Sequence, residues 1–85
     1  MARKELAAFG SAVRQYRSSL SLSQEELAER SGLHRTYVSG IERGERNVGL
    51  INVYRLADAL KISPAELFSA ADSLRRRSRR IATGR

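Results

Sequence analysis

The spacing of hydrophobic residues predicts an all-α protein with five helices and no strand. Apolar side chains recur every three or four residues, the interval at which residues share one face of a helix. The expected helices cover roughly residues 3–19, 24–31, 34–42 and 50–60, and a fifth follows Ser63. The residues expected to face the core are Leu6, Phe9, Val13, Tyr16, Leu20, Leu22, Leu27, Ala28, Val38, Ile41, Leu50, Val53, Leu56, Ala57, Leu60, Leu67 and Phe68.

The middle of the chain predicts two short helices joined by a tight turn. Ser23 and Glu26 have the spacing of a capping box that starts the first helix, and Gly32 supplies the turn. The second helix begins at His34, which is a weaker cap than serine or aspartate, and it stops before Gly44. Two helices with this spacing form a helix-turn-helix, whose second helix enters the major groove of DNA.

The last helix has a clear start but no clear end. Ser63, Pro64 and Glu66 supply the cap, the first helical residue and the acid of a second capping box. Gly49 is the expected N-cap of the helix before it. Nothing in residues 70–74 prevents the last helix from continuing into the arginines that follow.

The charge of the chain is concentrated at its C-terminal end. With 85 residues, of which 41% are hydrophobic and 29% charged, the chain fits one small domain. Residues 1–72 carry ten lysines and arginines against nine acids, whereas residues 73–85 carry six arginines and no acid. We therefore expect a DNA-binding domain over 1–72 and an arginine-rich tail over 73–85. The domain must owe its DNA affinity to the placement of its arginines.

Other functional classes find little support. The chain has no cysteine, so it has no disulfide and no thiolate ligand for zinc, and its single histidine, His34, lacks partners for a metal site. No apolar run reaches the roughly 18 residues of a transmembrane helix, and no signal peptide, phosphate-binding loop or nucleophile motif is visible. We expect a cytoplasmic, nucleoid-associated protein of a bacterium or phage. It should be no enzyme and use no metal, cofactor or small-molecule ligand.

The motif positions agree in register with a known superfamily. They are Gln24, Leu27, Ala28, Gly32, Val38, Ser39, Ile41, Glu42 and Gly44. On these positions the chain resembles the Cro/phage-repressor helix-turn-helix superfamily, over about Phe9 to Phe68. The segment from Arg35 to Arg43, followed by Arg46 and Asn47, resembles the controller proteins of restriction-modification systems. The resemblance implies a compact five-helix, lambda-repressor-like domain that regulates transcription by binding a pseudo-palindromic operator as a homodimer.

Four residues are candidates for contacts with bases. Arg35 is the best of them, because a guanidinium pairs bidentately with O6 and N7 of guanine. Thr36 and Ser39 each offer one hydrogen bond, and Arg46 has the reach to contact either a base or a phosphate. Gly40 should leave room for the helix to approach the groove closely. The alternative for Arg35 is an ordinary solvated helix residue.

Phosphate contacts would orient the helix-turn-helix on DNA. The residues expected to make them are Gln24, Tyr37, Arg43 and Asn47. Gln24 stands at the N-terminus of its helix, where the helix dipole favours an anion. The alternatives are partial burial for Tyr37 and, for Arg43, a surface ion pair with Glu42 or Glu45 worth under about 1 kcal/mol.

Glu42 is an acid on the helix that should face DNA, so we expect it to turn inward. Its partner there would be Arg14 or Arg17 of the first helix. Such a pair would fix the two helices together and keep the acid away from phosphates. Removing one partner of a semi-buried pair costs more than the pair itself contributes.

One helix-turn-helix covers about half a turn of DNA, which is too little contact for tight, selective binding. A dimer doubles the contact by binding two half-sites about 34 Å apart. Ile51 and Tyr54 lie on a face of the fourth helix that the core does not use, and Phe68 joins them from the fifth. The resemblance implies the same two helices as the interface. The alternative is ordinary, scattered exposure of apolar residues.

The arginine tail leaves other functions open. Arg75, Arg76, Arg77, Arg79 and Arg80 would add salt-dependent contacts to flanking phosphates, or they form an idle tail. Membrane binding lacks an amphipathic anchor beside the arginines. An antitoxin that binds a toxin protein and represses its own operon is an alternative to the regulator. A nonspecific nucleic-acid binder driven by the tail is another.

Overall fold

The computed structural model describes the backbone of residues 3–83 and the side chains of residues 4–77. The predicted all-α fold is confirmed, since five helices and no strand are present in this part of the chain. The helices are α1 (Arg3–Ser19), α2 (Gln24–Ser31), α3 (Arg35–Glu42), α4 (Leu50–Ala59) and α5 (Pro64–Thr83).

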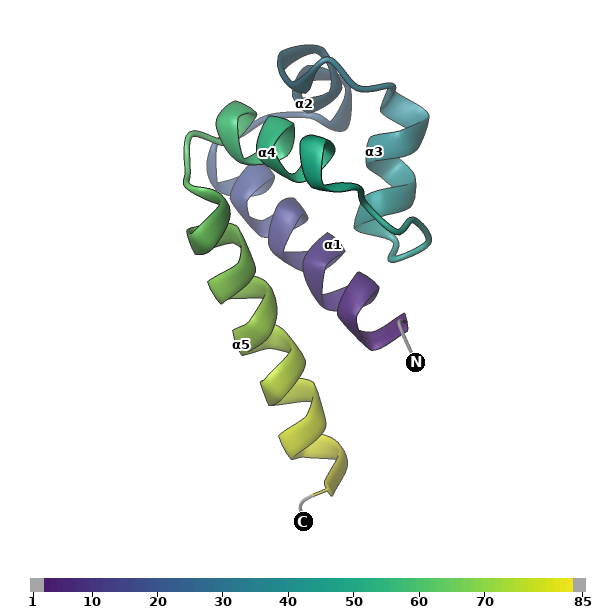
Figure 1. Cartoon of the computed structure of the whole chain (residues 1–85), viewed down its shortest axis with the longest axis vertical. Coiled ribbons are helices and arrows are strands. Elements are labelled where there is room, and N and C mark those ends of the chain that lie inside the picture. Colours follow the sequence, from purple (N-terminus) through teal and green to yellow (C-terminus); the bar gives the residue numbers. More distant parts are fainter. Residues whose placement is uncertain (1–2, 84–85) are drawn as a thin grey trace.

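Helix α1 is the centre of the arrangement. Figure 1 shows α5 along one side of α1 and α3 along the other, with α2 and α4 gathered near the C-terminal end of α1. Both α1 and α2 pack against α3, so the first two helices support the third. Because α1 separates α5 from α3, the arginines at the end of α5 lie across the domain from the second helix of the motif.

Most of the expected core is buried, with side chains from every helix. Three expected core residues are instead exposed: Leu20 by 40%, Leu50 by 68% and Phe68 by 50%. Leu20 follows the last residue of α1, where the chain turns away from the core. Leu50 begins α4 four residues before exposed Tyr54, so both lie on the same outward face. Phe68 stays half-exposed although its ring centre lies 5.6 Å from that of Phe9.

The first four helices end in the same kind of turn, a Schellman motif with one left-handed residue. At the ends of α2 and α3 this residue is glycine, with φ of 74° at both Gly32 and Gly44. At the ends of α1 and α4 it is Ser21, with φ of 58°, and Lys61, with φ of 61°. The last two positions accept a conformation that is costly for residues with a Cβ.

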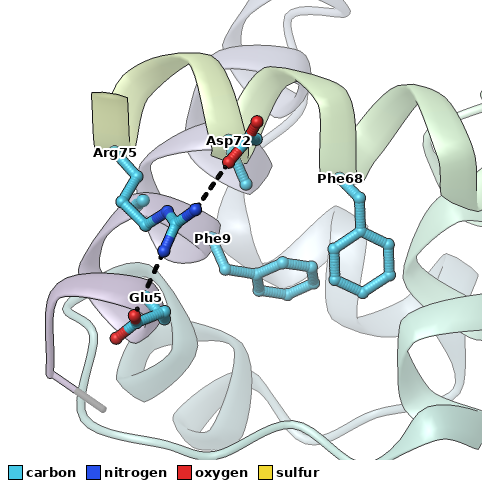
Figure 2. A pocket seen from close by; sticks show the side chains of 7 residues that line it. Glu5, Phe9, Phe68, Asp72 and Arg75 are labelled. Carbon is cyan, nitrogen blue, oxygen red and sulfur yellow. Dashed lines mark hydrogen bonds and ion pairs between the residues drawn. The ribbon is translucent and has the colours of Figure 1, made fainter. Parts of the chain in front are cut away.

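Helix α5 continues past the expected boundary at residue 72 and runs to Thr83. At that boundary its arginines are engaged within the domain, as Figure 2 shows: Arg75 donates to Glu5 of α1 over 3.4 Å and to Asp72 over 2.9 Å. Arg76 donates to Asp72 over 2.8 Å, and these hydrogen bonds lower the pKa of that carboxyl. The side chains of Arg79 and Arg80, and all of Arg85, lie outside the described residues.

Candidate nucleic-acid interface

Helix α3 has one buried face and one polar, exposed face. Val38 and Ile41 are buried in the core. On the opposite face Arg35, Thr36 and Arg43 are exposed, Ser39 is half-buried, and the four side chains line one shallow hollow. The structure therefore brings three of the predicted base-contacting residues and one predicted phosphate-contacting residue together. We call these four residues the α3 polar face.

The guanidinium of Arg43 is held within this face. It donates to Ser39 Oγ and, over 3.0 Å, to Glu45 Oε1. The second contact is one of the surface ion pairs expected for Arg43, and it raises the pKa of Arg43 while lowering that of Glu45. Both partners are exposed, so a phosphate can replace Glu45 at little cost.

Arg46 lies outside α3 but packs back onto it. Its guanidinium carbon is 5.9 Å from the centre of the Tyr37 ring, and its side chain crosses Gly40. Tyr37 is half-buried, which agrees with the partial burial given above as the alternative to a phosphate contact. Its hydroxyl accepts a hydrogen bond from Asn52 Nδ2 over 3.3 Å. The space over Gly40, expected to admit DNA, is filled here by Arg46.

Glu42 turns inward and joins three elements. Its carboxylate accepts from Arg17 Nε over 2.6 Å and Nη2 over 2.9 Å, and from Gln24 Nε2 over 3.0 Å. The third nitrogen of Arg17 donates to the Leu22 carbonyl over 2.8 Å, which ties the turn before α2 to the same network. The pairing with Glu42 raises the pKa of Arg17. The alternative prediction, that Arg14 pairs with Glu42, is wrong, because Arg14 is exposed on α1 outside this network.

The two remaining candidates for phosphate contacts differ in their surroundings. Gln24 is half-buried at the start of α2, and its amide nitrogen points to Glu42. Because an amide nitrogen carries two hydrogens, one remains for a phosphate while the other holds the side chain in place. Asn47 is exposed in the loop between α3 and α4.

Two residues that position the interface were missed in the sequence. Gly10 of α1 lies where that helix crosses the end of α3, and a Cβ there would overlap the carbonyl oxygen of Ile41 and come within 2.9 Å of that of Glu42. Asn52 of α4 fixes the Tyr37 hydroxyl. A glycine inside a helical pattern is a signal for close packing, whereas nothing in the sequence distinguishes Asn52.

A second surface is apolar. Ile51 and Tyr54 of α4 are exposed by 64% and 51%, and Leu50, which the sequence pattern predicts in the core, joins them on the same face. We call these three residues the α4 apolar patch. Phe68 of α5 is a further exposed apolar side chain, and it covers Phe9 beside the ion pairs of Arg75, as Figure 2 shows. Apolar side chains that gather on one exposed face, unlike single scattered ones, are typical of an interaction surface.

The described residues give no sign of a metal site or of a membrane span. Among residues with described side chains, no group of three or more histidine, cysteine, aspartate or glutamate residues is placed to hold a metal ion. In the same part of the chain, none of the helices combines the length and apolar character needed to cross a membrane.

Comparison with known proteins identifies relatives over the same segment. A model of the helix-turn-helix family matches residues 13–67. Control protein C.BamHI of Bacillus amyloliquefaciens is 53% identical over 60 residues, which cover 69% of this chain and 74% of that protein. Control protein C.SmaI of Serratia marcescens is 54% identical over 57 residues, covering 67% and 68%.

Solved structures agree. The restriction-modification controller protein C.AhdI of Aeromonas hydrophila has a TM-score of 0.73 and 56% identity, covering 74% of this chain and 96% of that one. The controller protein C.Esp1396I, solved as a tetramer with its natural 35 base-pair operator, has a TM-score of 0.77 and 30% identity, covering 84% and 93%.

Proposed function

The chain belongs to this helix-turn-helix family, and we propose that it is a sequence-specific transcriptional regulator, the controller protein of a restriction-modification system. The observation that carries the proposal is the α3 polar face, a set of hydrogen-bonding side chains, three exposed and one half-buried, on a helix anchored by α1 and α2. The controller proteins C.BamHI, C.SmaI and C.AhdI support the subtype by their identity to this chain over the motif.

In the proposed complex α3 lies in the major groove. Arg35 pairs with a guanine, and Thr36 and Ser39 supply single hydrogen bonds to neighbouring bases. Arg46 adds a base contact from the edge of the helix. Gln24, Tyr37, Arg43 and Asn47 bind phosphates on either side of the groove. Because Arg17 neutralises Glu42, the acid of α3 does not repel the DNA backbone.

The regulator acts as a homodimer on a pseudo-palindromic operator. The α4 apolar patch, together with Phe68, forms the two-fold interface and places two copies of α3 in successive major grooves, about 34 Å apart. Operator DNA of a bacterium or phage lies in the cytoplasm, so the protein works there. It binds without catalysis and needs no small-molecule ligand.

Selection of the protein's sites from random duplex DNA tests the function. The expected product is a pseudo-palindrome with half-sites one helical turn apart. Arg35→Ala should weaken binding by roughly 5- to 150-fold for each half-site, the equivalent of one lost base contact per protomer, and relax the preference at one position per half-site. Arg14→Ala, which removes another exposed helical arginine, is the matched control. Equal losses on selected and random DNA would exclude base recognition by Arg35.

Sedimentation of interface variants tests the dimer. Ile51→Glu with Tyr54→Glu should convert the protein to a folded monomer, because two carboxylates buried at a two-fold axis have no partners. Operator binding should fall with dimerisation, whereas Gln15→Glu on the exposed face of α1 should change neither. A double variant that remains dimeric would place the interface elsewhere.

A further inference from the structure

Arg46 is distinctive among the candidate DNA contacts because it comes from the loop after α3 and yet lies against that helix. Its side chain extends across Gly40, and its guanidinium is placed over the ring of Tyr37. Gly40 is buried although it follows Thr36 by one turn, on the flank of the polar face. The burial of a glycine at this position reflects its cover, the Arg46 side chain.

The contact requires glycine at position 40. A Cβ there would lie 3.0 Å from Arg46 Cγ, 3.3 Å from Nε and 3.7 Å from Cδ. These atoms belong to an exposed, flexible side chain, so a larger residue would displace the arginine and leave the fold in place. Glycine inside a helix otherwise lowers stability relative to alanine.

The other side of the contact is held from a different helix. Tyr37 packs partly into the core, and Asn52 of α4 donates to its hydroxyl over 3.3 Å. The ring is therefore fixed at both ends, by burial and by a hydrogen bond. A cation above an aromatic face gains electrostatic attraction as well as packing.

We propose that Gly40, Tyr37 and Asn52 are positioning residues that hold Arg46 in its DNA-binding conformation before DNA arrives. The inference rests on the proposed function and extends it to residues that need no base contact of their own. A free arginine loses side-chain entropy when it is immobilised in a complex, and a restrained one has already lost it. With two copies of Arg46 in each homodimer, this restraint strengthens operator binding about tenfold.

Gly40→Ala separates this role from a structural one. Thermal stability should stay the same or rise, because alanine favours the helix, while affinity for the selected operator should fall about tenfold. In an Arg46→Ala background the same substitution should cause no further loss. Gly49→Ala is the matched control, since its Cβ would meet no atom within 4 Å. An equal loss of operator affinity in both backgrounds would mean that Gly40 serves the approach of α3 to DNA, and the proposal would be wrong. It would also be wrong if Gly40→Ala caused no loss of affinity at all.

A measurement without DNA tests the packing by itself. In the free protein the ¹⁵N–¹H NOE of Arg46 Nε should exceed that of Arg35 Nε, which belongs to another exposed arginine. It should drop to the Arg35 value in Gly40→Ala and Tyr37→Leu, and by less in Asn52→Ala. Equal NOE values for the two wild-type arginines would overturn the inference, whether or not the protein selects an operator. A high NOE for Arg46 Nε in a protein that selects no operator would refute only the proposed function. An NOE that Gly40→Ala leaves unchanged would overturn the inference.

Discussion

Replacing Arg17 should be among the most damaging changes to the helix-turn-helix. The side chains of Arg17 and Glu42 are only 14% and 3% exposed, and Arg17 donates two hydrogen bonds to that acid and one to the Leu22 carbonyl. In Arg17→Met the carboxylate would keep one neutral donor, Gln24, in a largely water-excluded place. Breaking a buried pair costs about 3–5 kcal/mol, and the slight exposure of Arg17 puts the expected loss near the lower limit, about 3 kcal/mol.

Urea unfolding at pH 7 and one fixed protein concentration measures this loss, because dimer stability depends on concentration. The double variant Arg17→Met with Glu42→Leu should be at least about 1 kcal/mol more stable than Arg17→Met alone, since it leaves no buried charge. Arg14→Met, which removes an exposed arginine of the same helix, should change stability by less than about 0.5 kcal/mol. A loss under about 1 kcal/mol for Arg17→Met, the value of a surface pair, would refute the reasoning.

Three further predictions concern stability. Gly10→Ala should lower the free energy of unfolding by at least about 3 kcal/mol, because its Cβ would overlap the backbone oxygen of Ile41; a loss under about 1 kcal/mol in urea would contradict this. Lys61→Gly should raise the free energy of unfolding by up to about 1 kcal/mol, because glycine adopts the left-handed backbone conformation without strain; a lower free energy of unfolding would contradict this. Hydrogen bonds from Arg76 and Arg75 lower the pKa of Asp72, so this carboxyl stabilises the fold above its unfolded pKa near 3.8 and loses that contribution as pH falls through the lower folded value. Wild type should therefore lose more stability than Asp72→Asn on acidification to pH 3, and parallel curves would disprove the contribution.

The parts of the fold that sequence predicted are those specified by neighbouring residues. The capping box at Ser23 is confirmed by a 3.0 Å hydrogen bond from the Glu26 N–H to Ser23 Oγ and a 2.8 Å bond in return. The box at Ser63 has the same two contacts, at 3.0 and 2.9 Å. Such signals need only four consecutive residues of sequence, and they do not depend on the rest of the fold. The ends of α1 and α4, which lack glycine, gave no comparable local signal.

The interface depends more on contacts between distant residues, and these were only partly predicted. The inward turn of Glu42 followed from its charge. Arg14 and Arg17 are about one helical turn apart on α1, and hydrophobic periodicity does not show which of these two turns lies beside Glu42. The packing of Arg46 on Gly40 depends on the path of the loop after α3. Polar residues on an exposed face can be identified from pattern alone, whereas the side chains that restrain them require coordinates.

The error at Leu50 has a physical cause that bears on assembly. Val53, Leu56 and Leu60 fill the core side of α4, so an additional leucine in the same helix was assigned to the core. Its spacing of four residues from Tyr54 places it on the outward face, which is apolar beyond what the monomer can bury. A hydrophobic pattern records burial in the assembled protein as well as in the single chain. The exposed apolar side chain of Leu50 would be buried by a second copy packed on the α4 apolar patch. Leu50 therefore belongs with Ile51 and Tyr54 in the proposed interface.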